Sequence, residues 1–109
     1  MIPLSNFLRI NRKRRGLTQE EVAFLLGVKG ESRAIKVSRD ENSVREASLR
    51  AAVAYELIYG KLVSHLFAGL RREIVRDVKI RAKVLLHRRG KQNPKRLAAL
   101  TKLVSELST

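Results

Sequence analysis

The residues best suited to recognise another molecule are cationic and hydrogen-bonding side chains between positions 32 and 45. A helix predicted over residues 32–42 turns by about 100° per residue. It would place Ser32, Arg33, Lys36, Arg39 and Asp40 on one side, and Ala34, Val37, Ser38 and Glu41 on the other. Arginine can donate two hydrogen bonds to guanine, and lysine or serine can reach phosphates or bases. This pattern fits the major groove of DNA. A solvated helix face with a Lys36–Asp40 ion pair explains it equally well.

Residue types that support catalysis or metal binding are sparse. His65 and His87 are the only histidines, and they fall on different predicted helices without an acidic cluster at metal-ligand spacing. The chain has no cysteine, which excludes disulfides and thiolate metal sites. It also has neither a phosphate-binding glycine loop nor a nucleophile elbow. We therefore expect no enzyme, no metal and no cofactor.

Two predicted helices precede this segment and would position it. The first spans residues 5–15, with Ser5 or Asn6 as its N-cap. The second begins after Thr18, which forms a T-x-x-E capping box with Glu21. Its predicted buried residues are Val22, Leu25 and Leu26. Gly27 would close it before a turn at residues 28–30.

Two more helices are predicted to complete an all-α domain over residues 1–70. Ser48 would cap the fourth helix and Gly60 would end it. Its expected buried stripe is Leu49, Ala52, Val53 and Leu57, widened by Tyr55, Ile58 and Tyr59. A short fifth helix, capped near Ser64, would return Val63, Leu66 and Phe67 to the core. No segment alternates like a strand, so the expected fold class is all-α with five compact helices.

Several short motifs together resemble the Cro and phage-repressor type of helix-turn-helix domain, the Xre-like family of transcriptional regulators. They are L-R-x-x-R at 8–12, R-G-L-T-Q-E-E-V-A-x-L-L-G at 15–27, V-S-R-x-E at 37–41, S-L at 48–49 and L-F at 66–67. The resemblance covers residues 8–70. It implies a sequence-specific regulator of transcription, specifically a small repressor, which inserts its third helix into the major groove of duplex DNA.

The resemblance also implies roles for individual residues. Gln19 matches a glutamine that helps hold the DNA backbone at a helix N-terminus, and Arg12 and Glu41 match a pair that joins the first helix to the end of the third. The complete set of expected DNA-binding residues is Gln19, Lys29, Ser32, Arg33, Lys36, Ser38, Arg39 and Arg45. The chain departs from the family pattern by about three extra residues within 29–36, and by Asp40 at a position that is often apolar or aromatic.

The charge of the chain predicts a polyanionic partner. The formal net charge is +14, far more than solubility requires. Residues 71–96 carry 11 Lys and Arg against Glu73 and Asp77, a net charge of +9, whereas residues 1–70 carry +5. Much of the nonspecific attraction to DNA is therefore expected from residues 71–96. The alternative is that these cations are merely solvated.

Residues 71–109 are predicted to form a basic helical extension. One amphipathic helix would run to about Leu86, with Leu70, Ile74, Val78, Ala82 and Leu85 on one face. A second would begin after Asn93 and Pro94, with an apolar seam of Leu97, Leu100, Val104 and Leu107. These faces must pack against each other, the first domain or a partner. A homodimer is the most economical outcome.

Phe24 on the second predicted helix should point away from the core, which predicts that the extension or a second protomer covers it.

The longest apolar runs, such as residues 22–26, span five residues, far fewer than a bilayer requires, and no signal peptide is evident. We therefore expect a cytoplasmic protein without a membrane partner. Two alternatives remain: an antitoxin-like or other protein-interaction module that also binds DNA, with a protein partner at residues 71–109, and a basic RNA-associated protein.

Overall fold

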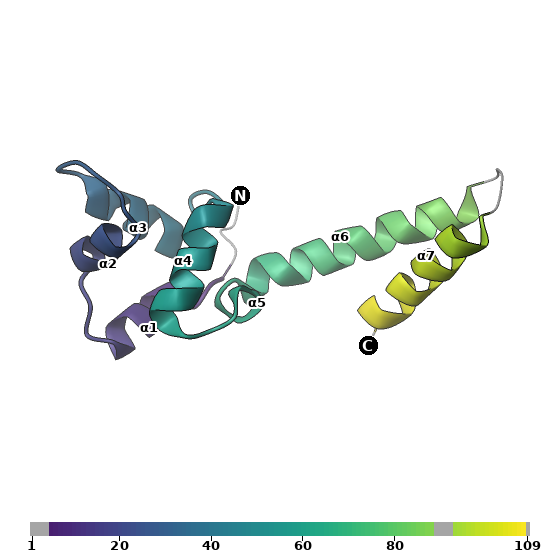
Figure 1. Ribbon diagram of the computed structural model, residues 1–109, viewed down its shortest axis with the longest axis horizontal. Helices are drawn as coiled ribbons and strands as arrows, with labels where there is room; N and C mark the ends of the chain where they lie inside the picture. Colours follow the sequence, from purple (N-terminus) through teal and green to yellow (C-terminus); the bar gives the residue numbers. More distant parts are fainter. Residues whose placement is uncertain (1–4, 89–92, 109) are drawn as a thin grey trace. The chain divides into compact units, whose positions relative to one another are not determined.

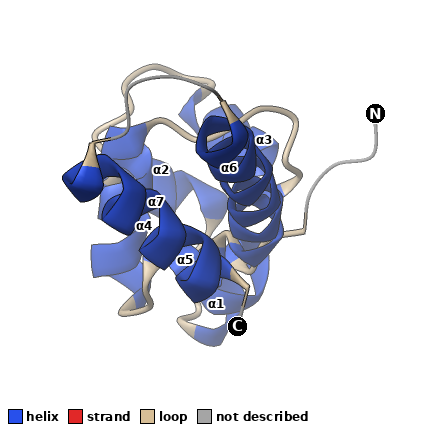
Figure 2. Cartoon of the chain, turned by 90° about the vertical axis from the view of Figure 1, so that its right-hand side faces the viewer, coloured by secondary structure: helices blue, strands red, loops and turns tan. Residues whose placement is uncertain are grey.

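The computed structural model describes residues 5–88 and 93–108. These residues form seven helices: α1 (Leu8–Arg14), α2 (Gln19–Leu25), α3 (Arg33–Glu41), α4 (Leu49–Tyr59), α5 (Val63–Leu66), α6 (Ala68–His87) and α7 (Pro94–Leu107) (Figure 1). Helices and loops account for the whole described part, with no strand (Figure 2). The predicted all-α fold class is confirmed. No helix in the described ranges is long and apolar enough to cross a membrane.

The chain divides into two compact units, Met1–Leu70 and Arg71–Thr109. In the first unit, α2 packs against α3, and α1 contacts both α3 and α4. Each helix contributes buried side chains to one core, which contains Leu8, Val22, Ala23, Val37, Ala51, Tyr55, Tyr59 and Leu66. This core holds α3 by its inner side and leaves its outer side in solvent.

Local sequence signals set several helix ends as predicted. The Thr18 hydroxyl accepts from the Glu21 amide (3.0 Å), and the Glu21 carboxylate accepts from the Thr18 amide (2.9 Å), completing the capping box. Ser48 accepts from the Ala51 amide at the start of α4. Gly60 ends α4 with a left-handed φ of 62°, a conformation that costs glycine little. At the start of α7, Asn93 accepts from the Lys95 amide (2.9 Å).

Two predicted helix starts were wrong. Helix α1 begins at Leu8, with Phe7 at the cap position, rather than at Ser5 or Asn6. The Asn6 side chain nevertheless contacts this end of the helix as a cap would, because its Oδ1 accepts from the Leu8 amide (3.1 Å). Its Nδ2 donates to the Asp40 carbonyl (2.9 Å) near the end of α3. Helix α5 begins at Val63 rather than near Ser64. Its first amide is satisfied from α4, since Glu56 Oε1 accepts from Val63 N (3.0 Å).

The predicted buried faces of α2 and α4 need correction. On α4, the burial predicted for Ala52, Tyr55 and Tyr59 is confirmed, and Ala51 is buried with them. Leu49 (81% exposed), Val53 (47%) and Leu57 (79%) lie in solvent instead. The two tyrosine rings stack with centroids 5.9 Å apart, and an aromatic pair of this kind stabilises a core beyond the area that it buries. On α2, Leu25 is 53% exposed and Ala23 is fully buried instead. The small alanine suits the close packing of α2 on α3.

The second unit contains most of α6 and all of α7. Helix α7 turns back beside the C-terminal half of α6 (Figure 1), where Arg96 Nη2 donates to the Leu85 carbonyl (3.2 Å). Ala82 of α6 is buried. The seam residues Leu85, Leu100, Val104 and Leu107 are half-buried. Two of the residues expected on these faces, Ile74 and Leu97, remain largely exposed. Of the basic residues counted in the sequence, Arg89 and Lys91 lie outside the described residues.

Candidate functional site

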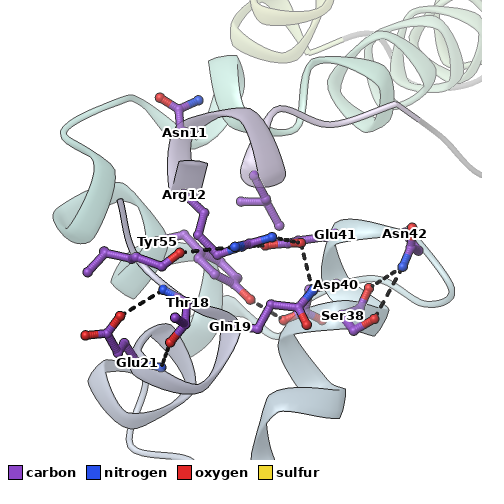
Figure 3. Close-up of polar contacts among 12 residues, drawn as sticks. Asn11, Arg12, Thr18, Gln19, Glu21, Ser38, Asp40, Glu41, Asn42 and Tyr55 are labelled. Atoms are coloured by element: carbon purple, nitrogen blue, oxygen red, sulfur yellow. Dashed lines mark hydrogen bonds and ion pairs between the residues drawn. The ribbon is translucent and has the colours of Figure 1, made fainter. Parts of the chain in front are cut away.

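A buried ion pair fixes the end of α3 against α1. Arg12 Nε donates to Glu41 Oε2 (2.6 Å) and Arg12 Nη2 to Glu41 Oε1 (3.3 Å), while Arg12 Nη1 donates to the Leu17 carbonyl (Figure 3). The hydrogen bonding that Arg12 donates to Glu41 is the main cause that raises the pKa of Arg12 above its usual value. The expected structural pairing of Arg12 with Glu41 is confirmed.

Gln19 belongs to the same network. It is the first residue of α2, and its Nε2 donates to Glu41 Oε1 (3.1 Å) (Figure 3). One glutamate therefore ties α1, α2 and α3 together. The Gln19 side chain is half-buried and its amide is turned toward Glu41. The structure thus gives it a positioning contact at the place where a backbone contact to DNA was expected.

Asp40 was predicted to lie on the outer side of α3. This prediction was wrong, because Asp40 is buried with only 2% of its surface exposed. Its Oδ2 accepts from Tyr55 Oη (2.7 Å) (Figure 3). The same oxygen contacts Lys36 Nζ at 3.4 Å. The Lys36–Asp40 ion pair of the alternative interpretation is present, but the solvated helix face expected with it is not, because Asp40 is buried. Burial, together with the hydrogen bond and charge of Asp40, raises the pKa of Tyr55 far above its usual value. Tyr55 stays a neutral donor, and this donor makes the burial of a carboxylate possible.

Arg33 is tied to α2. Its Nε forms an ion pair with Glu20 Oε1, and its guanidinium lies over the Phe24 ring, 5.4 Å from the centroid. This arrangement gives Phe24 a partner within its own unit, although the ring is still 67% exposed. Partly exposed ion pairs contribute little stability, so Arg33 can exchange Glu20 for another anion at small cost.

An open hollow of about 540 Å³ lies between the turn that follows α2 and the outer side of α3. It is lined by Val28, Lys29, Gly30, Glu31, Ser32, Arg33, Ile35, Lys36, Arg39 and Arg45. The structure therefore brings together Lys29, Ser32, Arg33, Lys36, Arg39 and Arg45 from the predicted set. Gln19 and Ser38 lie outside the hollow. Ser38 is half-buried, and its carbonyl accepts from Asn42 Nδ2 (2.9 Å).

The cations that line the hollow differ in whether they already have an acidic partner. Arg33 and Lys36 have acidic partners, Glu20 and Asp40. Lys29, Arg39 and Arg45 are exposed, and none of the three forms an ion pair or side-chain hydrogen bond within residues 5–88 and 93–108. Glu31 is the single acidic residue in the lining. The hollow is thus a basic surface with three unengaged charges.

Sequence reasoning missed Ile35. Its side chain lines the hollow and is 49% exposed, one helical turn before Arg39. An exposed β-branched residue beside cations can contact an apolar group such as the methyl of thymine. The available signal was its spacing of four from Arg39, which places both on one side of a helix.

No group of three or more His, Asp or Glu residues that could hold a metal ion occurs in the described chain. Comparisons with protein-family models, with curated proteins and with solved structures found no match.

Proposed function

We propose that this protein is a sequence-specific regulator of transcription, specifically a small repressor, that inserts α3 into the major groove of duplex DNA. In this proposal residues 1–70 are a five-helix helix-turn-helix domain of the Cro and phage-repressor type, followed by a basic helical extension. The observation that carries the proposal is the basic hollow, where Lys29, Arg39 and Arg45 are unengaged around the outer side of α3. A polyanion satisfies these charges better than solvent alone.

The way in which α3 is fixed to the core supports its insertion into the major groove. An α-helix with its side chains measures about 10–12 Å across, and the major groove is about 12 Å wide. Val37, Asp40 and Glu41 are held on the inner side by packing and hydrogen bonds. The outer side chains can therefore enter a groove without disturbing the core.

We assign different contacts with DNA to the residues that line the hollow. Arg39 is placed to form two hydrogen bonds to a guanine, and Ile35 to contact a thymine methyl. Lys29, which precedes α3, and Arg45, which follows it, also line the hollow and would bind phosphates and fix the register. Arg33 would join the readout only after leaving Glu20. In this proposal Gln19 acts mainly by positioning α3.

We propose that the working form is a homodimer, because proteins of this class read two half-sites related by symmetry. The exposed apolar row Leu49, Val53 and Leu57 on α4 is a suitable contact. Leu49 and Leu57 lie one helical turn on either side of Val53. If α4 of a second copy packed antiparallel to this helix about Val53, Leu49 of one chain would contact Leu57 of the other. Isolated exposed apolar residues are common, but a contiguous apolar row of this kind is typical of an interaction surface.

The same row is what favours a second candidate, a protein-interaction module of the antitoxin kind that also binds DNA. A different polypeptide would then cover Leu49, Val53 and Leu57. The purified full chain separates the two candidates, because a homodimer forms without any other component.

Selection of bound sequences from a pool of random duplex DNA, using the full-length protein, tests the proposal. The expected result is enrichment of one motif with two related half-sites. Recovery of random sequences would show that binding is purely electrostatic, and absence of binding to duplex DNA would remove the proposal altogether.

A further inference from the structure

Helix α6 carries a straight row of four cations, Arg72, Arg76, Lys79 and Lys83, here called the α6 row. Their spacings of four, three and four residues keep them within an arc of about 60° on a helix that turns 100° per residue. The row lies entirely in the second unit and shares no residue with the hollow at α3. Its regularity distinguishes it from the scattered charges elsewhere on α6.

The charges of the α6 row are available for binding. Arg72, Arg76 and Lys83 are exposed and Lys79 is half-buried. Arg76 contacts Asp77 at 3.5 Å, with both side chains in solvent, and the other three side chains form no ion pair in the described ranges. The acidic residues Glu73 and Asp77 lie about 100° or more around the helix from Arg72. Four like charges on one face repel one another unless an anion lies along them.

We infer that the α6 row is a second binding surface for the phosphodiester backbone of duplex DNA, separate from the hollow at α3. The row is about 16 Å long at 1.5 Å per residue, which equals the rise of about five base pairs along the axis of a duplex at 3.4 Å each. Lysine and arginine charges spaced in this way match phosphates and carry no information about bases. The surface therefore adds affinity on every sequence.

The surroundings of the α6 row favour DNA over a membrane. A helix that lies on a bilayer needs one continuous apolar face. On α6 the exposed apolar residues are Ile74, Ile80 and Val84. Ile80 and Val84 share one side of the helix, but the acidic Glu73 and Asp77 continue that side, and Arg81 separates it from Ile74. A phosphate backbone requires only the cations.

Two double variants of the full-length protein test this inference. Arg72→Gln with Arg76→Gln removes two charges from the row, and Arg71→Gln with Arg81→Gln removes two exposed arginines of the same helix that lie off the row. Affinity for a duplex of random sequence is measured over a range of salt concentrations. The row variant should reduce the slope of log K against log salt by about 2, and the off-row variant by clearly less. Melting temperatures measured alongside show that both variants are folded.

Equal changes of slope in the two variants would overturn the inference, because net charge alone would then explain binding. It would also be overturned if the row variant bound DNA normally but lost binding to vesicles of mixed neutral and anionic phospholipid. The inference deepens the proposed function but can fail separately from it. An Arg39→Gln and Arg45→Gln variant probes the hollow. If this variant keeps the wild-type sequence preference while the row variant shows the reduced salt slope, the proposed function fails and the inference about the α6 row stands.

Discussion

Tyr55 on α4 donates a 2.7 Å hydrogen bond to the buried carboxylate of Asp40 on α3. The other Asp40 oxygen, Oδ1, is also buried and has no hydrogen-bond partner among the described residues. This contact joins the inner side of the proposed recognition helix to the aromatic core. The stability of the first unit and the presentation of α3 should therefore depend on the same hydroxyl.

Replacing Tyr55 with Phe should destabilise the protein by about 1–3 kcal/mol, because it leaves a buried carboxylate short of a donor. Tyr59→Phe is the matched control, since the Tyr59 hydroxyl is buried without a partner in the part of the chain that the structure describes. That control should be neutral or slightly stabilising. Urea denaturation of both variants provides the comparison, and equal effects would contradict the importance of the Tyr55–Asp40 bond.

Stability should fall in alkaline solution. Burial is the main cause that raises the pKa of Tyr59 from 10.0 to about 12. Because the folded form then holds its proton more tightly than the unfolded chain, this contribution is complete below pH 10 and is lost as the pH rises toward 12. Denaturation midpoints between pH 9 and 12, with phenolate absorbance recorded in parallel, would follow the loss. Tyr59→Phe should make the decline shallower, and an unchanged profile in this variant would contradict the assignment.

The free energy of unfolding should fall more when one partner of the Arg12–Glu41 pair is removed than when both are replaced. Arg12→Met leaves Glu41, whose side chain is 2% exposed, with Gln19 as its remaining side-chain donor, and should cost about 3–5 kcal/mol. The double variant Arg12→Met with Glu41→Met should recover much of that loss. A double-mutant cycle measured by denaturation tests this. Simple additivity of the two single effects would show that the pair is not coupled.

Leu57→Gln should weaken self-association if the α4 row is the dimer contact, because it places a polar group in the apolar surface. Its fold should be unaffected, since Leu57 is 79% exposed. Light scattering over a range of concentrations measures the mass, and Leu62→Gln, at another exposed leucine (67%) off the row, is the control. Identical masses for wild type and Leu57→Gln would remove the row from the interface.

The parts of the fold that follow from local chemistry were predictable. The capping box at Thr18, the cap at Ser48, the αL glycine at Gly60 and the Asn93 cap each depend on hydrogen bonds or backbone conformations within a few residues. The buried side of α4 was predictable only in part. Ala52, Tyr55 and Tyr59 were expected there and are buried, but the aliphatic stripe has the same spacing as the tyrosine stripe and was expected there too. Packing against other helices decided in favour of the rings.

In the candidate site, too, local features could be predicted and contacts between distant residues could not. The cations of α3 could be identified from residue type and helical spacing. Their partners could not, because Glu20 is 13 residues from Arg33 and Tyr55 is 15 residues from Asp40. These contacts exist only once α2 and α4 have packed on α3. The fold therefore determines which cations are engaged and which remain free.

Arg39 provides the most direct test of the central claim that α3 reads DNA sequence. Affinities of wild type and Arg39→Ala are measured on the selected duplex and on a random duplex at one salt concentration. The account predicts that the substitution costs about 1–3 kcal/mol on the selected duplex and much less on the random one. An equal loss on both duplexes would reduce Arg39 to a phosphate contact and contradict base readout by α3.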